Sequence, residues 1–303
     1  MQFSAWPNQS GQWEPLREFG QHVEATGWDG LWVADHFMPN QADNSGPTGE
    51  AWMTLSALAA TVPRIRLGTM VTGNTYRHPA VLAKMAAQVD IISGGRLVLG
   101  IGSAWQKNEH EAYGIPFHTV GGRLRRLEES VQVLRGLFER ERTTFEGKFY
   151  QLDNAPLAPK PVQRPWPRLL IGGGGEQVTM RIAAQYADEW NVWGSPETLR
   201  HKIGVLRAHC ERLGRDASEI RKSANAMVVI TDDASEAASV RERNPRALAG
   251  SAAELQGMMQ EYIDAGVDEL VVPMFTLRGD AGSLEATKAH ADRVMAEVAS
   301  AFR

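Results

Sequence analysis

The stretch Gly30-Leu31-Trp32-Val33-Ala34-Asp35-His36-Phe37 joins an apolar run to two titratable side chains. The run is typical of a buried β-strand. An aliphatic strand has no packing use for a carboxylate beside an imidazole, and catalytic groups tend to lie on loops held by a rigid scaffold. The alternative is a helix cap beside a histidine that the loop satisfies. Strand neighbours point to opposite faces, so a shared site requires the strand to end before His36.

Composition indicates an ordinary globular protein. The chain has 303 residues, 43% of them hydrophobic and 22% charged, and a formal net charge of -4. This charge gives no basic excess, so we expect no nucleic-acid partner. Cys210 is the single cysteine, which leaves no internal disulfide and no cysteine-based zinc site. The start of the sequence lacks the features of a signal peptide, and no apolar run approaches the roughly 20 residues that span a bilayer. We therefore expect a cytoplasmic protein without membrane contact.

Short apolar runs alternate with stretches of helical period along the chain. The expected strands are residues 3–6, 30–34, 65–71, 97–102, 169–171, 190–193, 226–230 and 269–273. Eight strand-then-helix units predict a (β/α)8 TIM barrel, an α/β fold, formed by one domain over residues 1–303. A doubly wound sheet is the alternative. No junction carries its dinucleotide fingerprint, since Gln177 stands where the third glycine of the run at 172–175 would belong.

Two connections are too long for plain barrel turns. Residues 142–167 contain a hairpin-like segment at 145–150, and residues 231–250 are rich in charge. Long loops at the C-terminal mouth of a barrel commonly act as lids. We expect both insertions at that mouth.

The barrel fold would gather several polar or glycine-rich strand ends at one mouth. These ends are 35–36, 70–74, 102–105, 172–175 and 190–193. Four successive glycines before a helix expected at 176–186 predict phosphate binding, because backbone amides can approach an anion there. A tight turn alone would need one glycine or two. Trp105, Trp190 and Trp193 either wall a site for a ring system or belong to the core.

Other catalytic patterns are poorly supported. The chain has no G-x-S-x-G elbow. Asn108-Glu109-His110-Glu111 resembles a fragment of H-E-x-x-H but lacks the second histidine, so we expect a solvated helix face there and no metal site. An aromatic cleft, an anion loop and an acid/base pair without a protein nucleophile suit a cofactor that performs the reaction itself.

Four segments resemble one known family. They are residues 27–37, residues 67–72 with 76–79, residues 94–102 and residues 170–175. These segments resemble the luciferase-like flavin-fold superfamily, and specifically its branch of oxidoreductases that use the deazaflavin coenzyme F420. The resemblance runs from about residue 27 to residue 193 and is weaker beyond.

The resemblance implies roles for individual positions. The coenzyme ring would lie at the end of the third strand, on a bulge with a non-proline cis peptide at Met70-Val71. Asp35 would hydrogen-bond the ring, and His36 would transfer the substrate proton. The positions implied or expected to contact the coenzyme are Asp35, Met70, Val71, Ser103, Asn108, Gly172, Gly173, Gly174 and Gly175. The branch's sugar-phosphate dehydrogenases carry an acidic residue after the fourth strand, where this chain has Trp105, so that substrate is not expected.

These observations together predict an oxidoreductase that transfers a hydride between coenzyme F420 and a small organic substrate, with His36 as the acid/base. One alternative is an FMN-dependent monooxygenase on the same fold. Another is a non-catalytic protein that binds a flavin or deazaflavin. Barrels of this superfamily commonly pair, so a homodimer is expected.

Overall fold

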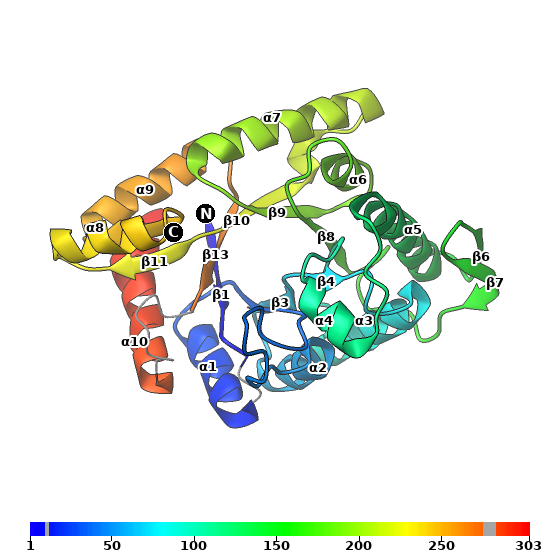
Figure 1. Ribbon diagram of the computed structural model, residues 1–303, viewed down its shortest axis with the longest axis horizontal. Coiled ribbons are helices and arrows are strands. Elements are labelled where there is room, and N and C mark those ends of the chain that lie inside the picture. The colour runs from blue at the N-terminus through cyan, green and yellow to red at the C-terminus, as the bar shows by residue number, and fades with distance from the viewer. Residues whose placement is uncertain (10–11, 275–282) are drawn as a thin grey trace.

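The protein forms a closed barrel of eight parallel strand positions surrounded by helices (Figure 1). The computed structural model describes residues 1–9, 12–274 and 283–303. The barrel strands are β1 (Gln2–Trp6), β2 (Gly30–Val33), β3 (Arg66–Thr69) continued by β4 (Thr72–Gly73), β5 (Leu97–Gly102), β8 (Arg168–Gly172), β9 (Glu189–Trp193), β10 (Arg221–Asn225) and β13 (Glu269–Pro273). The order runs β3-β2-β1-β13-β10-β9-β8-β5, and pairing of β3 with β5 closes the ring. The predicted TIM barrel is confirmed.

Helices form the outer layer. They are α1 (Trp13–Ala25), α2 (Ala51–Thr61), α3 (Pro79–Ser93), α5 (Val120–Glu139), α6 (Thr179–Tyr186), α7 (Pro196–Leu213), α9 (Ala252–Asp264) and α10 (Leu284–Arg293), followed by the short turns Val294–Val298 and Ala299–Phe302. Local sequence sets their ends: the Ser195 side chain caps α7 before Pro196, and Gly214 ends it in a left-handed conformation. Within the described residues no helix is long and apolar enough to cross a membrane.

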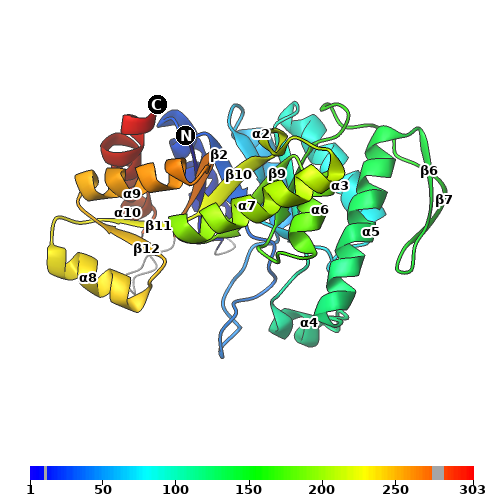
Figure 2. The same cartoon turned by 90° about the horizontal axis from the view of Figure 1, so that it is seen from above.

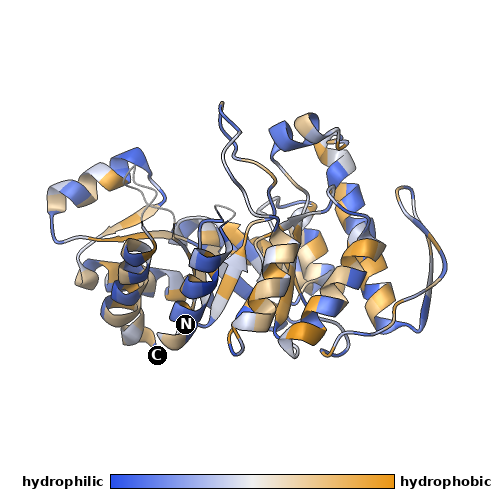
Figure 3. Cartoon of the chain, turned by 90° about the horizontal axis from the view of Figure 1, so that it is seen from below, coloured by the Kyte–Doolittle hydropathy of each residue, from blue (hydrophilic) through white to orange (hydrophobic). Residues whose placement is uncertain are grey.

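Two hydrophobic cores hold the layers together. Along β2, Leu31 and Val33 pack outward against the helices, whereas Trp32 points into the barrel. The inner core consists of Trp6, Trp32, Met70, Val98, Leu170 and Val271. Figure 3 shows apolar residues along the strands and hydrophilic residues on much of the outer helix surface. The barrel interior is therefore a packed core, and any open space must lie at its ends.

The seventh barrel strand differs from the prediction. The expected strand at 226–230 contains β11 (Met227–Ile230), which pairs with β12 (Ala247–Gly250) outside the barrel. The barrel position belongs instead to β10, whose sequence is polar. Ser223 and Asn225 both hydrogen-bond to Asn191 of β9 inside the barrel, at 2.9 Å each. Polar side chains satisfy one another here, so the apolar pattern did not reveal this strand.

The insertion at 231–250 lies at the mouth, as predicted. It comprises α8 (Ala234–Arg243) and β12, and it follows β11, which comes directly after the C-terminal end of β10. In Figure 2, α8 and α4 (Lys107–Tyr113) lie on the side opposite the two termini. The loop of residues 34–50 is the third segment at this end, since it follows β2.

The insertion at 142–167 contains the predicted hairpin, but its predicted location is wrong. Strands β6 (Arg142–Glu146) and β7 (Gln151–Pro156) pair antiparallel. They connect the end of α5 to the start of β8, so the insertion begins and ends at the amino-terminal side of the barrel. The Glu129 carboxylate of α5 accepts hydrogen bonds from the backbone N–H groups of residues 148–150. This hairpin therefore packs on the outside of α5.

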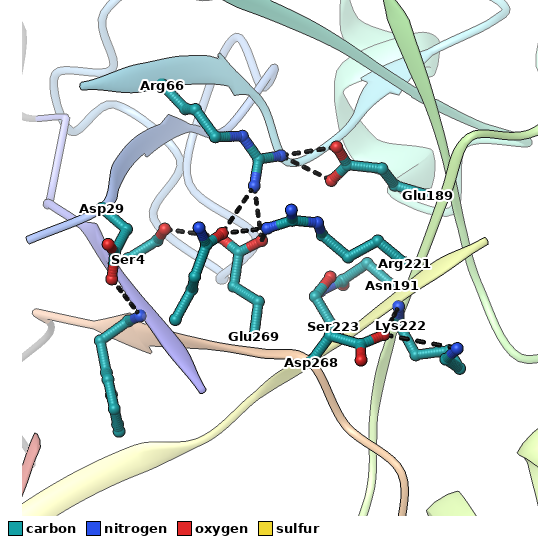
Figure 4. Close-up of polar contacts among 12 residues, drawn as sticks. Ser4, Asp29, Arg66, Glu189, Asn191, Arg221, Lys222, Ser223, Asp268 and Glu269 are labelled. Carbon is teal, nitrogen blue, oxygen red and sulfur yellow. Dashed lines mark hydrogen bonds and ion pairs between the residues drawn. The ribbon is translucent and has the colours of Figure 1, made fainter. Parts of the chain in front are cut away.

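A charged network closes the amino-terminal end of the barrel (Figure 4). Arg66 donates two hydrogen bonds to Glu189, at 2.7 and 2.6 Å, and one to Glu269 at 3.0 Å. Glu269 also accepts from the Ser4 hydroxyl at 2.5 Å and from the Trp32 indole at 3.4 Å. Both carboxylates are fully buried, and the hydrogen bonds offset part of the cost of burying their charge.

Candidate active site

A cavity of about 560 Å³ lies at the carboxyl ends of the strands. Its lining includes Trp6, Asp35, His36, Met70, Val71, Gly73, Tyr76, Gly102, Ser103, Ala104, Trp105, Gly172, Gly173, Gly174, Asn191, Val192, Trp193, Asn225 and Arg246. Eight of the ten predicted site residues are in this set. Asn108 and Gly175 are not among the lining residues that the structure describes. The position of the cavity at the carboxyl ends of the strands matches the general location of active sites in TIM barrels.

Strand β2 ends at Val33, so the chain is free to turn both Asp35 and His36 toward the cavity. The strand thus ends before His36, which is the condition for Asp35 and His36 to share a site. His36 Nδ1 lies 2.9 Å from Oε1 of Glu109, a residue 73 positions away in the sequence. The His36 side chain is 25% exposed, whereas the Glu109 side chain is fully buried. A buried carboxylate thus orients an imidazole that keeps access to the cavity.

Glu109 is the centre of a hydrogen-bond network that sequence reasoning missed. Besides His36, its carboxylate accepts from the backbone N–H of Phe37 at 2.8 Å and from the Tyr76 hydroxyl. Burial raises the pKa of Glu109, but the hydrogen bonds from His36, Phe37 and Tyr76 outweigh it and leave the pKa below its ordinary value. Burial and the bond to Glu109 raise the pKa of Tyr76, so its hydroxyl stays protonated. Glu109 is therefore a charged acceptor held by three donors.

The expectation of a solvated face at residues 108–111 is wrong for its two central residues. Glu109 and His110 are both fully buried, because α4 packs them against residues of the mouth. His110 bonds the Gln106 carbonyl at 2.7 Å and the Thr75 hydroxyl at 2.7 Å, which satisfies both ring nitrogens. Within the described ranges no group of three histidine, cysteine or acidic side chains is arranged to hold a metal ion.

Asp35 is held by an arginine. Arg77 donates to its two carboxylate oxygens at 2.6 and 3.1 Å and also reaches Glu50. Burial raises the pKa of Asp35, and the charge and hydrogen bonds of Arg77 act against this shift. Both oxygens already have a donor, so any contact of Asp35 with a ring would add to this ion pair.

The bulge predicted at the third strand is present. The Met70-Val71 peptide is cis, and five residues from Gly68 to Thr72 oppose four from Val98 to Ile101 on β5. The Val71 side chain then lies close to neighbouring strands. A Cβ atom built on Gly102 or Gly172 would lie 2.9 or 2.8 Å from a Val71 methyl group. These glycines therefore have a packing role in the cavity floor.

Local steric constraints also explain why glycine occupies positions of the run at residues 172–175. Gly173 has a φ of +123°, which side chains rarely adopt, and a Cβ on Gly174 would lie 2.9 Å from Val192. The following helix begins at Thr179 and not at 176, with a turn between them. Phosphate binding by this run remains a prediction, since packing accounts for Gly172 and Gly174 and the positive φ accounts for Gly173.

The predicted aromatic residues divide between wall and core. Trp105, 62% exposed, meets His36 edge to face at 5.5 Å between ring centroids. Trp193 lines the cavity beside Trp6, at 6.2 Å. Trp190 lies in the outer core, and its indole N–H donates to the Gly173 carbonyl at 2.9 Å. Trp105 and Trp193 thus wall the cavity, whereas Trp190 fixes the glycine run.

Asn108 has a structural contact of its own. Its side-chain amide donates to the Pro39 carbonyl at 3.0 Å, and its carbonyl accepts from the Glu109 backbone at 2.9 Å. These bonds fix α4 against the loop of residues 34–50. Asn108 therefore positions Glu109, and its contact with a coenzyme remains a prediction.

Comparison with known proteins gives the same assignment as the fold. The model of the luciferase-like monooxygenase family matches residues 1–300, and the chain belongs to that family. It is 33% identical to the F420-dependent glucose-6-phosphate dehydrogenase of Kineococcus radiotolerans, over 73% of this chain and 66% of that protein. It is 28% identical to the pyrimidine monooxygenase RutA of Stutzerimonas stutzeri, over 83% of this chain and 70% of that protein. The resemblance to this superfamily is confirmed.

A solved structure shows the same fold. The coenzyme F420 dependent tetrahydromethanopterin reductase from Methanopyrus kandleri superposes with a TM-score of 0.83 at 20% identity, over 100% of this chain and 99% of that one. The matches to the first F420-dependent relatives span from half to about two thirds of those proteins' length, 50% to 66%. Their activities therefore enter only as support for a proposal.

Proposed function

We propose that this enzyme transfers a hydride between coenzyme F420 and a small organic substrate, with His36 as the acid/base. One observation carries the proposal: an imidazole open to the cavity is held by a buried carboxylate, His36 Nδ1 to Glu109 Oε1 at 2.9 Å. The F420-dependent names of several relatives support the choice of coenzyme.

In this proposal the two ring nitrogens of His36 have different roles. Glu109 has a lowered pKa and accepts, so Nδ1 carries the proton and donates to it. In the neutral ring, Nε2 is then the unprotonated nitrogen, and it is the one available to take a proton from a substrate hydroxyl. In the reverse direction the doubly protonated ring returns that proton. Glu109 stabilises the charged form by its own negative charge.

The residues around the cavity floor fit a flat coenzyme ring. Gly102, Gly172 and Gly173 line the floor without side chains, next to the Val71 bulge. Ser103 also lines the cavity, and its hydroxyl has no hydrogen-bond partner among the described residues. These groups would hold the coenzyme, with the amides of Gly173 and Gly174 near its phosphate. When bound, the coenzyme accepts or supplies the hydride.

A monooxygenase that uses reduced FMN is the second candidate. Relatives named as a pyrimidine monooxygenase and as an FMNH(2)-dependent dimethylsulfone monooxygenase favour it. The test is to incubate the enzyme with oxidised F420 and a panel of alcohols and lactones, and with reduced F420 and conjugated carbonyls, following coenzyme absorbance. Oxygen consumption with reduced FMN is measured in parallel. Change of F420 absorbance without oxygen uptake supports the proposal, and the reverse pattern supports the monooxygenase.

We also propose that the protein forms a homodimer and is located in the cytoplasm. A homodimer is supported by Met53 on α2 and Val81 on α3, which are 71% and 54% exposed on neighbouring helices. Apolar side chains of this size are commonly covered at interfaces. A cytoplasmic location is supported by the sparse use of cysteine, since the sequence contains only Cys210. The single domain over 1–303 also remains a prediction.

A further inference from the structure

Arg246 brings a positive charge to the cavity from outside the barrel. It lies in the turn between α8 and β12, within the insertion that follows β11, and it is one of the residues that line the cavity that holds His36. The turn is ordered by its own contacts: the Arg246 backbone N–H donates to the Asn244 side chain at 3.1 Å, and Ala247 begins the pairing with Met227. The insertion thus fixes the backbone from which this guanidinium reaches the mouth.

The other charged side chains of the lining are already paired. Asp35 is bound to Arg77, and His36 is bound to Glu109. The two amides of the lining, Asn191 and Asn225, bond each other in both directions at 3.1 and 2.9 Å. These side chains therefore have their charge and hydrogen-bond partners within the protein.

Arg246 differs from them. Within residues 1–9, 12–274 and 283–303, its guanidinium has neither an ion pair nor a hydrogen bond. A guanidinium offers five donors in a planar fork that matches a carboxylate or phosphate. In a cavity where the carboxylate of Asp35 is already neutralised, this unmatched charge favours an anionic group.

We propose that Arg246 is a specificity-determining residue that binds an oxyanion, a carboxylate or a phosphate, on the substrate. The inference rests on the proposed function in taking this cavity as the substrate site. The same chemistry could be supplied by the phosphate of the coenzyme. The glycine run at Gly172–Gly174 lies on β8 and the loop after it, whereas Arg246 comes from the insertion after β10, so the coenzyme phosphate and the substrate anion have separate candidate positions.

The test uses benzoate and benzamide, which have the same shape and differ in charge. Binding is followed by quenching of the cavity tryptophans Trp105 and Trp193, with and without bound coenzyme. The wild type should bind benzoate about tenfold more tightly than benzamide, the size expected for one charge-assisted contact. Arg246→Gln should remove this preference and leave benzamide affinity unchanged. Arg246→Lys should retain part of it.

Arg243→Gln is the matched control, because Arg243 is exposed on α8 of the same insertion and is not among the lining residues described. It should keep the wild-type preference. The proposal is overturned if Arg246→Gln keeps that preference, or if the wild type has none. A variant that loses coenzyme affinity while its benzoate preference persists would assign Arg246 to the coenzyme phosphate and also overturn it. Because the measurement needs no turnover, the anion preference can hold even where F420 binding fails, which separates the two proposals.

Discussion

The two ends of the barrel carry similar charged groups but use them differently. At the amino-terminal end, Arg66 meets Glu189 and Glu269, and the surrounding donors complete the network (Figure 4). At the mouth, Glu109 is equally buried, yet it holds His36, which is 25% exposed beside a cavity. At the closed end the charges are bound by one another and by neighbouring polar side chains such as Ser4 and Trp32.

The difference shows which feature identifies a site in this fold. Buried arginines and carboxylates occur at both ends, so a buried charge by itself does not indicate catalysis. The mouth differs because its network ends on a titratable group with access to open space. Substitutions at the closed end should therefore lower the free energy of unfolding, and substitutions at the mouth should lower turnover.

The largest effect is expected from Arg66→Leu. It removes the cation between two buried carboxylates and should lower the free energy of unfolding by about 3 kcal/mol, the lower end for breaking a buried ion pair. Chemical denaturation measures this loss. The control is Arg66→Leu with Glu189→Gln and Glu269→Gln, which should recover part of the stability. A single variant as stable as the wild type would contradict the account of the closed end.

His36→Ala is expected to have the opposite effect, a loss of turnover with little loss of stability. Turnover should fall by roughly 10², the usual range for loss of a general acid or base. Coenzyme affinity should stay within about threefold, which is under 1 kcal/mol, and unfolding should change little, because the imidazole is partly exposed. The measurements are steady-state kinetics, coenzyme titration and thermal unfolding. Full activity would remove His36 from the mechanism and leave Asp35, Glu50 or a bound water to move the proton.

Gly173→Val tests the glycine run. The φ of +123° at this position disfavours any side chain, and a β-branched one would also block the approach of an anion to the backbone amides. Coenzyme affinity should fall by more than about tenfold, or 1.4 kcal/mol. Gly175→Ala is a useful comparison, since Gly175 is outside the described lining. If Gly173→Val binds normally while its melting temperature falls, the run serves the turn alone.

Glu109→Gln should have the smallest effect on rate, about tenfold, as for other outer partners that orient a functional histidine. Its stability should also respond differently to acid. The pKa of Glu109 lies below its ordinary value of 4.5, so its contribution is present above that value and is lost as the pH falls through the folded-state pKa. Wild-type stability should therefore drop more steeply below about pH 5 than that of Glu109→Gln. Parallel curves in acid denaturation would show that the carboxylate is not stabilised by its three donors.

The sequence was sufficient for the strands whose apolar pattern reflects burial, such as β2 and β5. It was insufficient where the barrel interior is polar, because Ser223 and Asn225 of β10 are satisfied only by Asn191 of another strand. The hairpin at 142–156 was recognisable, but its end of the barrel was not, since that depends on α5 preceding it.

The same limit applied to the site. Asp35 and His36 were predictable because they interrupt an apolar run. Glu109 was not, because its partner His36 is 73 residues away and its neighbours on α4 read as a charged surface. Tyr76 and Arg77 lay within a segment that matched the family, and this was the available signal for them. Contacts distant in sequence require the fold before they can be assigned.

The proposed preference of this mouth is for coenzyme F420 over FMN. Its most direct test is titration of the apo-protein with each coenzyme, following absorbance and tryptophan fluorescence. The account predicts that F420 binds at least about tenfold more tightly, equivalent to 1.4 kcal/mol. Tighter binding of FMN by the same factor, with oxygen consumption in the presence of reduced flavin, would contradict it and identify a monooxygenase.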